Sequence, residues 1–206
     1  MSDTSLIHTT AEKRMLLSSI FIVILIGIAY SQMFAVIIPL YYANAFQNTD
    51  MILCIIFFIT SFRFFVGNQL HLLNPEINTL RGTIWLYDLI VITLQTLLII
   101  FLGSLCVADQ NTKVNYDFFT ILTYLYIVDI GWIMSQWLFG MIHTEYKRQS
   151  IPWPWLILNS GLLVSIWIIR TISIHVYTPM MLTILCIING VAFIVDVMLI
   201  DYHNVL

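Results

Sequence analysis

Residues 84–108 read IWLYDLIVITLQTLLIIFLGSLCVA, a run in which Asp88 is the only charged side chain. A helix needs about 20 mostly apolar residues to cross the roughly 30 Å hydrocarbon core of a bilayer, so this stretch is long enough to span a membrane. Five further stretches share its length and character. The six predicted spans are residues 15–43, 51–73, 84–108, 118–142, 153–176 and 179–200.

The composition of the whole chain agrees with this interpretation. Of the 206 residues, 60% are hydrophobic and 9% are charged, whereas soluble domains carry about 25% charged residues. Continuous apolar runs also favour helices over the short alternating strands of a membrane barrel. We therefore expect an all-α polytopic membrane protein with six transmembrane helices. The connecting loops are too short for a second domain, so residues 1–206 are predicted to form one domain.

Basic residues are distributed unevenly between alternate loops. If the amino terminus is cytoplasmic, the outer loops contain only Lys113, and the remaining loop and tail basic residues lie inside. The inner set is Lys13, Arg14, Arg81, Lys147 and Arg148. This positive-inside pattern predicts that both termini are cytoplasmic. We expect an integral protein of a bacterial inner (plasma) membrane whose first span is retained as an anchor, because no clear cleavage site follows it.

Ionisable side chains interrupt the apolar spans at five positions. Each one costs a few kcal/mol near the centre of a bilayer, so each should face protein or water and have a partner. The five are Arg63, Asp88, Asp129, Arg170 and Asp196.

Polar residues recur at seven-residue intervals on two consecutive spans. Asp88 and Gln95 lie on the third span, and Asp129 and Gln136 lie on the fourth. Seven helical steps return to nearly the same face. Because the two spans run antiparallel, Asp88 should lie level with Gln136, and Gln95 level with Asp129.

Arg63 on the second span lies about 15 Å from the cytoplasmic end at 1.5 Å per residue. That depth favours a direct ion pair with Asp129, supported by Gln95, because a guanidinium and a carboxylate bond well side by side. The predicted buried polar column is Arg63, Asn68, His71, Asp88, Gln95, Asp129 and Gln136. These groups could line a path for an ion or fix the helices in register.

Two further features of the spans bear on packing. Arg170 lies in the outer third of its span and Asp196 in the inner third, so we expect no direct pair between them. Gly27, Ser31 and Ala35 recur at intervals of four, and such a ridge of small residues allows close approach of another helix or lines a pore.

Signatures of catalysis, cofactor binding and metal binding are missing from the sequence. It contains no phosphate-binding loop, no dinucleotide-binding glycine pattern and no His-Glu-x-x-His, and its three cysteines lack metal-site spacing. Tyr87 and Asp88 resemble the first half of the presenilin-type aspartyl protease pattern. The second half requires Gly-x-Gly before its aspartate, and Asp129 follows Tyr-Ile-Val instead. We expect no enzyme, no cofactor and no metal.

Two functions remain open. The first is a homo-oligomeric membrane protein that conducts or transports an ion, a proton or a small solute through the polar column. The second is a non-transporting subunit that senses or disrupts the membrane together with a soluble cytoplasmic partner, as accessory proteins of stress or antiviral systems do. Lys147 and Arg148 are the candidate partner contacts. The dispersed net charge of −3 argues against binding of nucleic acid.

Overall fold

The computed structural model describes residues 3–73, 82–107, 116–142, 153–172 and 179–204. Six helices within these ranges are long and apolar enough to cross a membrane, which confirms the expected all-helical architecture for the described residues. The helices are α1 (Asp3–Tyr42), α2 (Asn48–Leu73), α4 (Gly82–Ser104), α5 (Tyr116–Ile142), α6 (Trp153–Ile172) and α7 (Pro179–Asn204). The predicted side of each terminus stays a prediction, and the basic loop positions 81, 113, 147 and 148 lie outside the described residues.

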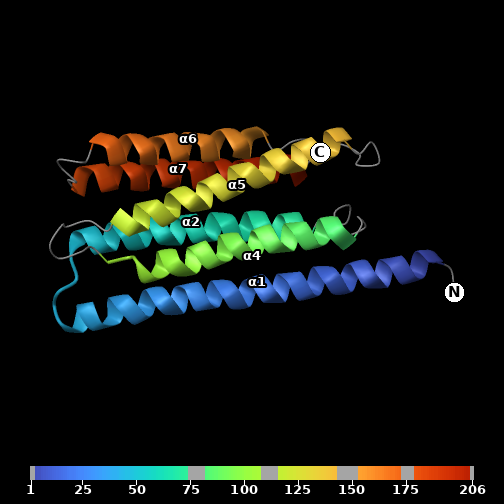
Figure 1. Cartoon of the computed structure of the whole chain (residues 1–206). Coiled ribbons are helices and arrows are strands. Elements are labelled where there is room, and N and C mark those ends of the chain that lie inside the picture. The colour runs from blue at the N-terminus through green and yellow to red at the C-terminus, as the bar shows by residue number, and fades with distance from the viewer. Residues whose placement is uncertain (1–2, 74–81, 108–115, 143–152, 173–178, 205–206) are drawn as a thin grey trace.

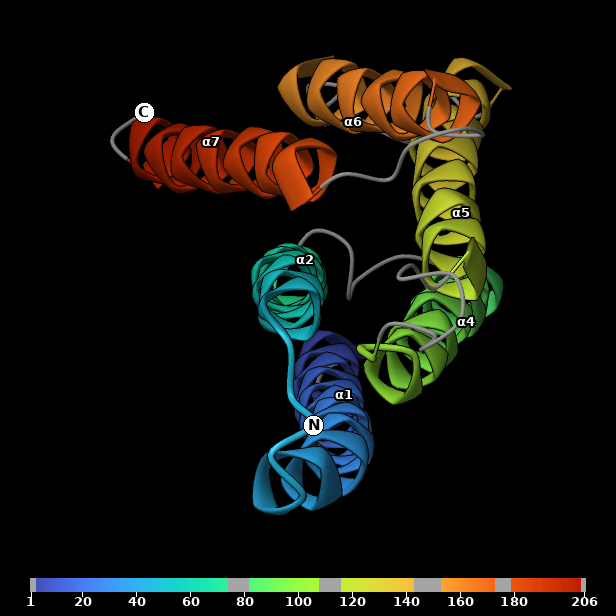
Figure 2. The ribbon, with the colours of Figure 1, turned by 90° about the vertical axis from the view of Figure 1, so that its left-hand side faces the viewer.

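Consecutive helices run in alternating directions along the bundle. As a result, the first residues of α1 and the last residues of α7 lie at the same end of the bundle (Figure 1). We call this the terminal end of the bundle and the opposite one the far end. Helices α2, α4, α5, α6 and α7 form a closed ring, because each contacts the next and α7 returns to α2 (Figure 2). Helix α1 packs on α2 and α4 outside this ring.

The turn between α1 and α2 at the far end is fixed by local hydrogen bonds. Asn44 has a φ of 54°, and its neighbour Ala45 donates its backbone N–H to the carbonyl oxygen of Leu40 at 2.9 Å. A residue in the left-handed region with this bond pattern is the Schellman ending of a helix. Helix α2 then starts with the Asp50 carboxylate accepting the Gln47 backbone N–H at 2.8 Å, one half of a capping box.

Close approach of α1 to the bundle depends on a glycine of α4. A Cβ placed on Gly103 would lie 2.7 Å from the carbonyl oxygen of Ala29 and 3.2 Å from the ring of Phe57. Both Ala29 and Phe57 are fully buried. Small residues therefore do bring two helices together here, but at a position that the spacing of small residues in the sequence did not indicate.

The core of the ring has two chemically different halves. From mid-depth to the far end, the buried side chains of the ring helices are mostly aliphatic and aromatic. They include Leu53, Phe57, Ile99, Leu102, Phe118, Phe119, Leu122, Ile166, Leu182 and Leu185. From mid-depth to the terminal end, all five ring helices contribute buried polar side chains. These include Arg63, Asn68, Asp88, Gln95, Tyr126, Asp129, Asn159, Asn189 and Asp196. We call the second set the polar core.

Candidate functional site: the polar core of the ring

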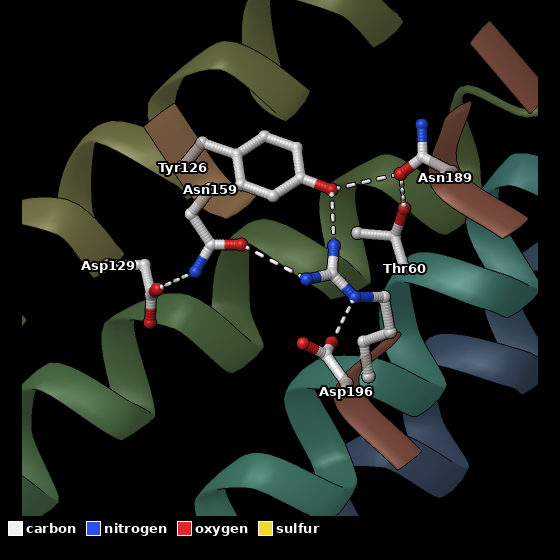
Figure 3. Close-up of polar contacts among 7 residues, drawn as sticks. Thr60, Tyr126, Asp129, Asn159, Asn189 and Asp196 are labelled. Carbon is white, nitrogen blue, oxygen red and sulfur yellow. Dashed lines mark hydrogen bonds and ion pairs between the residues drawn. The ribbon is translucent and has the colours of Figure 1, made fainter. Parts of the chain in front are cut away.

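An ion pair between α2 and α7 lies at the centre of the polar core. The Arg63 Nε donates to Asp196 Oδ2 at 2.5 Å, and the two side chains are 4% and 12% exposed (Figure 3). Arg63 lies ten residues before the end of α2 and Asp196 eight before the end of α7, so the two reach a similar depth. The pair offsets part of the cost of burying both charges.

The remaining Arg63 nitrogens connect this pair to α5 and α6. One terminal nitrogen donates to Asn159 Oδ1 at 3.2 Å, and the other lies 3.4 Å from the Tyr126 hydroxyl. The Asn159 amide nitrogen in turn donates to Asp129 Oδ2 (Figure 3). Asn159 therefore stands between the guanidinium and the Asp129 carboxylate.

Asp129 is held from the other side by two amides in series. Gln95 Nε2 donates to Asp129 Oδ1 at 2.9 Å, and Gln95 Oε1 accepts a hydrogen bond from Asn68 Nδ2 at 3.1 Å. All three residues are buried. Both oxygens of the Asp129 carboxylate therefore accept from neutral amide donors.

At mid-depth the polar core ends in hydroxyl and amide groups. The Tyr126 hydroxyl donates to Asn189 Oδ1 at 2.9 Å, and Thr60 Oγ1 lies 3.4 Å from the same oxygen. Asn189 Nδ2 donates to the carbonyl oxygen of Leu185 one turn earlier on α7. Beyond this layer the apolar half of the core begins.

A second cluster lies nearer the terminal end, around Asp88. Trp132 Nε1 donates to Asp88 Oδ1 at 2.9 Å, and Gln136 Nε2 donates to the same oxygen. His71 Nε2 lies 3.1 Å from Asp88 Oδ2, and its ring meets the Trp132 ring edge-on at 4.6 Å. Asp88 is 1% exposed, whereas the His71 side chain is 18% exposed and Gln136 is also partly exposed, so the cluster is accessible at His71 and Gln136.

When His71 is protonated, Asp129 is the carboxylate of the polar core that lacks a cation in direct contact. Arg63 balances Asp196, and His71 balances Asp88 when its ring is protonated. Asp129 has neutral hydrogen-bond partners. The arrangement can therefore hold one additional positive charge at Asp129, supplied by a proton or a small cation.

The structure corrects the predicted partner of Arg63. The expected direct pair with Asp129 is replaced by the pair with Asp196, and Asn159 occupies the space between Arg63 and Asp129. The reason is the order of helices in the ring: α2 contacts α7, and α5 lies between α4 and α6. Asp196 was compared only with Arg170 in the sequence, because neither helix order nor a return of the last span to the second is visible there.

Other predicted contacts within the column are present. Asp88 is hydrogen-bonded to Gln136, and Gln95 to Asp129. The contact of Asn68 with Gln95 was not predicted. Sequence reasoning missed Asn159 and Asn189, although both are strongly polar side chains in the middle of apolar spans. We expected each charged side chain inside an apolar span to face protein and to have a partner. The same expectation, applied to amide side chains, would have found Asn159 and Asn189.

The remaining candidates lie away from the polar core. Gly27, Ser31 and Ala35 are on the exposed face of α1, and no atom lies within 4 Å of a Cβ built on Gly27. Arg170 is exposed on α6. Lys147 and Arg148 lie outside the described residues. Among the residues that the structure describes, no group of three or more His, Cys, Asp or Glu side chains could hold a metal ion.

Comparison with known proteins adds no assignment to this geometry. No protein-family model, no curated protein and no solved structure matches the chain.

Proposed function

We propose that this chain is a small multi-pass membrane protein that conducts or transports a small ion, which enters the polar core from the terminal end. The charge balance around Asp129 is the observation that carries the proposal. Asp129 is 6% exposed and accepts hydrogen bonds from Gln95 and Asn159, which are neutral. A carboxylate buried without a cation costs several kcal/mol, so the site favours uptake of a proton or a small cation.

The apolar half of the core supports a gated path over an open pore. The fully buried rings of Phe118 and Phe119 on α5 belong to this half. Hydrophobic constrictions block ions by excluding water, and they conduct only after their side chains separate. Transport would therefore require a second conformation in which the far half of the ring opens.

The exposed ridge of α1 supports assembly of several copies. Gly27, Ser31 and Ala35 leave the backbone of α1 accessible on the side away from the ring. Ridges of this kind allow helices of neighbouring chains to pack closely in a membrane. In this proposal the oligomer surrounds or braces the ring and leaves the polar core within each copy.

The apolar half also favours one alternative function, a non-transporting subunit that senses or disrupts the membrane together with a soluble partner. A polar core that is closed toward the far end could change its charge state without passing an ion across. The partner would then bind at the terminal end, near Lys147 and Arg148. This alternative requires no flux through the purified protein.

Ion flux in liposomes separates the two functions. The full chain is reconstituted with a pH-sensitive dye or a cation-sensitive dye inside, and a potassium diffusion potential drives the ion. We expect flux with the unchanged chain and its loss in Asp129→Asn. Asp117→Asn is the matched control, because it removes the same charge from the exposed beginning of α5 and should keep the flux.

The absence of flux from the unchanged chain for protons, sodium and potassium, at either polarity of the potential, would contradict the transport proposal. If Asp129→Asn left the flux unchanged, the ion would not pass through the polar core. A pull-down in which Lys147→Ala and Arg148→Ala abolish capture of a soluble protein, together with the absence of flux, would favour the alternative.

A further inference from the structure

The two oxygens of Asp129 have partners of different kinds, although both partners are amides. Oδ2 accepts from Asn159, whose orientation is fixed. Arg63 has only donors, so the Asn159 oxygen must face Arg63 and the Asn159 nitrogen must face Asp129. Oδ2 therefore stays a hydrogen-bond acceptor in every state of the site.

The partner of Oδ1 is free to reverse. Gln95 donates to Oδ1 and accepts from Asn68, so these amides form a chain that points toward Asp129. The oxygen and nitrogen ends of an amide have nearly the same size, so each group can turn end for end in the same space. After both turn, Gln95 would offer its oxygen to Asp129 and its nitrogen to the oxygen of Asn68. In either orientation of the two amides, one hydrogen bond joins Gln95 to Asp129 and one joins Gln95 to Asn68.

We propose that Asp129 is a proton-binding site at its Oδ1 atom, and that the Gln95 and Asn68 amides reverse together when the proton binds. The inference rests on the proposed function and names the ion as a proton. In the binding step a hydronium ion transfers its proton to Oδ1, a new O–H bond forms, and water leaves. The Asp129 group changes from a charge of −1 to neutral, and its O–H then donates to the Gln95 oxygen.

The geometry favours a proton over a metal cation. Sodium, potassium and divalent cations need several oxygen ligands around them. In the ionised arrangement both Asp129 oxygens face N–H groups, whose positive ends repel a cation. A proton needs only one acceptor, and the reversed Gln95 amide supplies it.

The charged and titratable groups around Asp129 come from three helices. Arg63 on α2 and Asp196 on α7 act on it electrostatically, and Tyr126 lies one turn earlier on α5. Arg63 is already paired with Asp196 at 2.5 Å. The facing groups from α4 and α6 are the neutral amides of Gln95 and Asn159. Asp129 therefore takes up the proton that balances the polar core.

Infrared difference spectroscopy of the full chain in liposomes tests this site directly. The carbonyl stretch of a protonated carboxyl group differs from that of a carboxylate, so a step in pH should give a carboxyl band together with a side-chain amide change. We expect Asp129→Asn to lose the carboxyl band and Asp117→Asn to keep it. Gln95→Met should lose the amide change, because the Gln95 amide is removed and nothing then couples Asn68 to Asp129.

A second variant keeps the test decisive if Asp129→Asn does not fold. Asp129→Glu retains a carboxyl group, so the band should persist at a shifted frequency. A carboxyl band identical in the unchanged chain and in both Asp129 variants would overturn the inference. An amide change that persists in Gln95→Met would overturn the reversal.

The infrared spectrum tests the proton site and the flux assay tests transport, so the two proposals can be contradicted separately. An Asp129 band without flux would leave the proton site in place and remove the transport proposal. Flux that depends on Asp129 but has no accompanying carboxyl band would keep transport and overturn the proton site.

Discussion

Arg63 and Asp196 are 133 positions apart in the chain and 2.5 Å apart in the fold. Removal of one member leaves the other as an uncompensated buried charge, which costs about 3–5 kcal/mol in comparable pairs. We expect Asp196→Asn and Arg63→Gln to lower the free energy of unfolding by about that amount each. Unfolding in mixed micelles, followed by circular dichroism, measures the change.

The double variant is the control for this pair. With both charges removed, neither group is left unpaired, so much of the lost stability should return. Losses that simply add in the double variant would show that the two side chains act independently. Glu12→Gln, at an exposed position of α1, should change the unfolding free energy by less than about 0.5 kcal/mol.

The sequence predicted most of the buried polar residues of the site, but not Asn159 and Asn189, and it predicted only part of the pairing. The seven-residue spacing on two consecutive spans indicated the Gln95 contact with Asp129, which is a neighbour contact between α4 and α5. The partner of Arg63 depends on ring closure between α2 and α7. No local pattern encodes that closure, because every helix of the ring carries a polar residue at a similar depth.

Helices α1 and α4 approach each other closely where Gly103 faces Ala29. Gly103→Ala would place a methyl group 2.7 Å from the Ala29 carbonyl oxygen, so the helices must separate. Overpacking of this kind costs about 1–3 kcal/mol. We expect a lower free energy of unfolding, measured in the same micelles.

Gly131 on α5 provides the matched control. Nothing lies within 4 Å of a Cβ built on Gly131, so Gly131→Ala meets no steric clash. Alanine favours a helix over glycine by about 1 kcal/mol, so this variant should be neutral or more stable. Equal losses of stability in the two variants would contradict the close approach at Gly103.

The sequence predicts that all six helices exist, but it does not predict where each of them begins and ends. The apolar runs place α2, α4, α5 and α7 within a few residues of their observed limits. Helix α1 begins at Asp3, well before the predicted start at residue 15. Its first turns are polar, and hydropathy detects only the part of a helix that could lie in lipid.

For the whole molecule, the alternation of helices fixes which loops share a side, and the basic residues predict which side is cytoplasmic. We expect a cysteine at position 12 to react with a membrane-impermeant reagent from the cytoplasm and one at position 44 to react from the opposite side. Glu12 and Asn44 are both exposed. The background is a chain whose Cys54, Cys106 and Cys186 are replaced by alanine. Labelling of both positions from one side would contradict the six-span topology.

The order of helices in the ring is the part of the whole fold that sequence could not supply. In a membrane, apolar surfaces do not drive helices together, because lipid is equally apolar. The choice of neighbours therefore depends on close packing and on polar contacts between side chains far apart in the chain. Arg63 with Asp196 and Tyr126 with Asn189 are such contacts.

The separation of Arg63 from Asp196 also has a consequence for biogenesis. A ribosome completes α2 long before it makes α7, so Arg63 enters the insertion machinery when its partner does not yet exist. A solitary arginine at the centre of a helix opposes insertion by about 2.5–3.5 kcal/mol. Helix α2 therefore carries a cation without its carboxylate partner until α7 has been made. The ion pair forms only when translation has reached the final span, so every shorter chain lacks it.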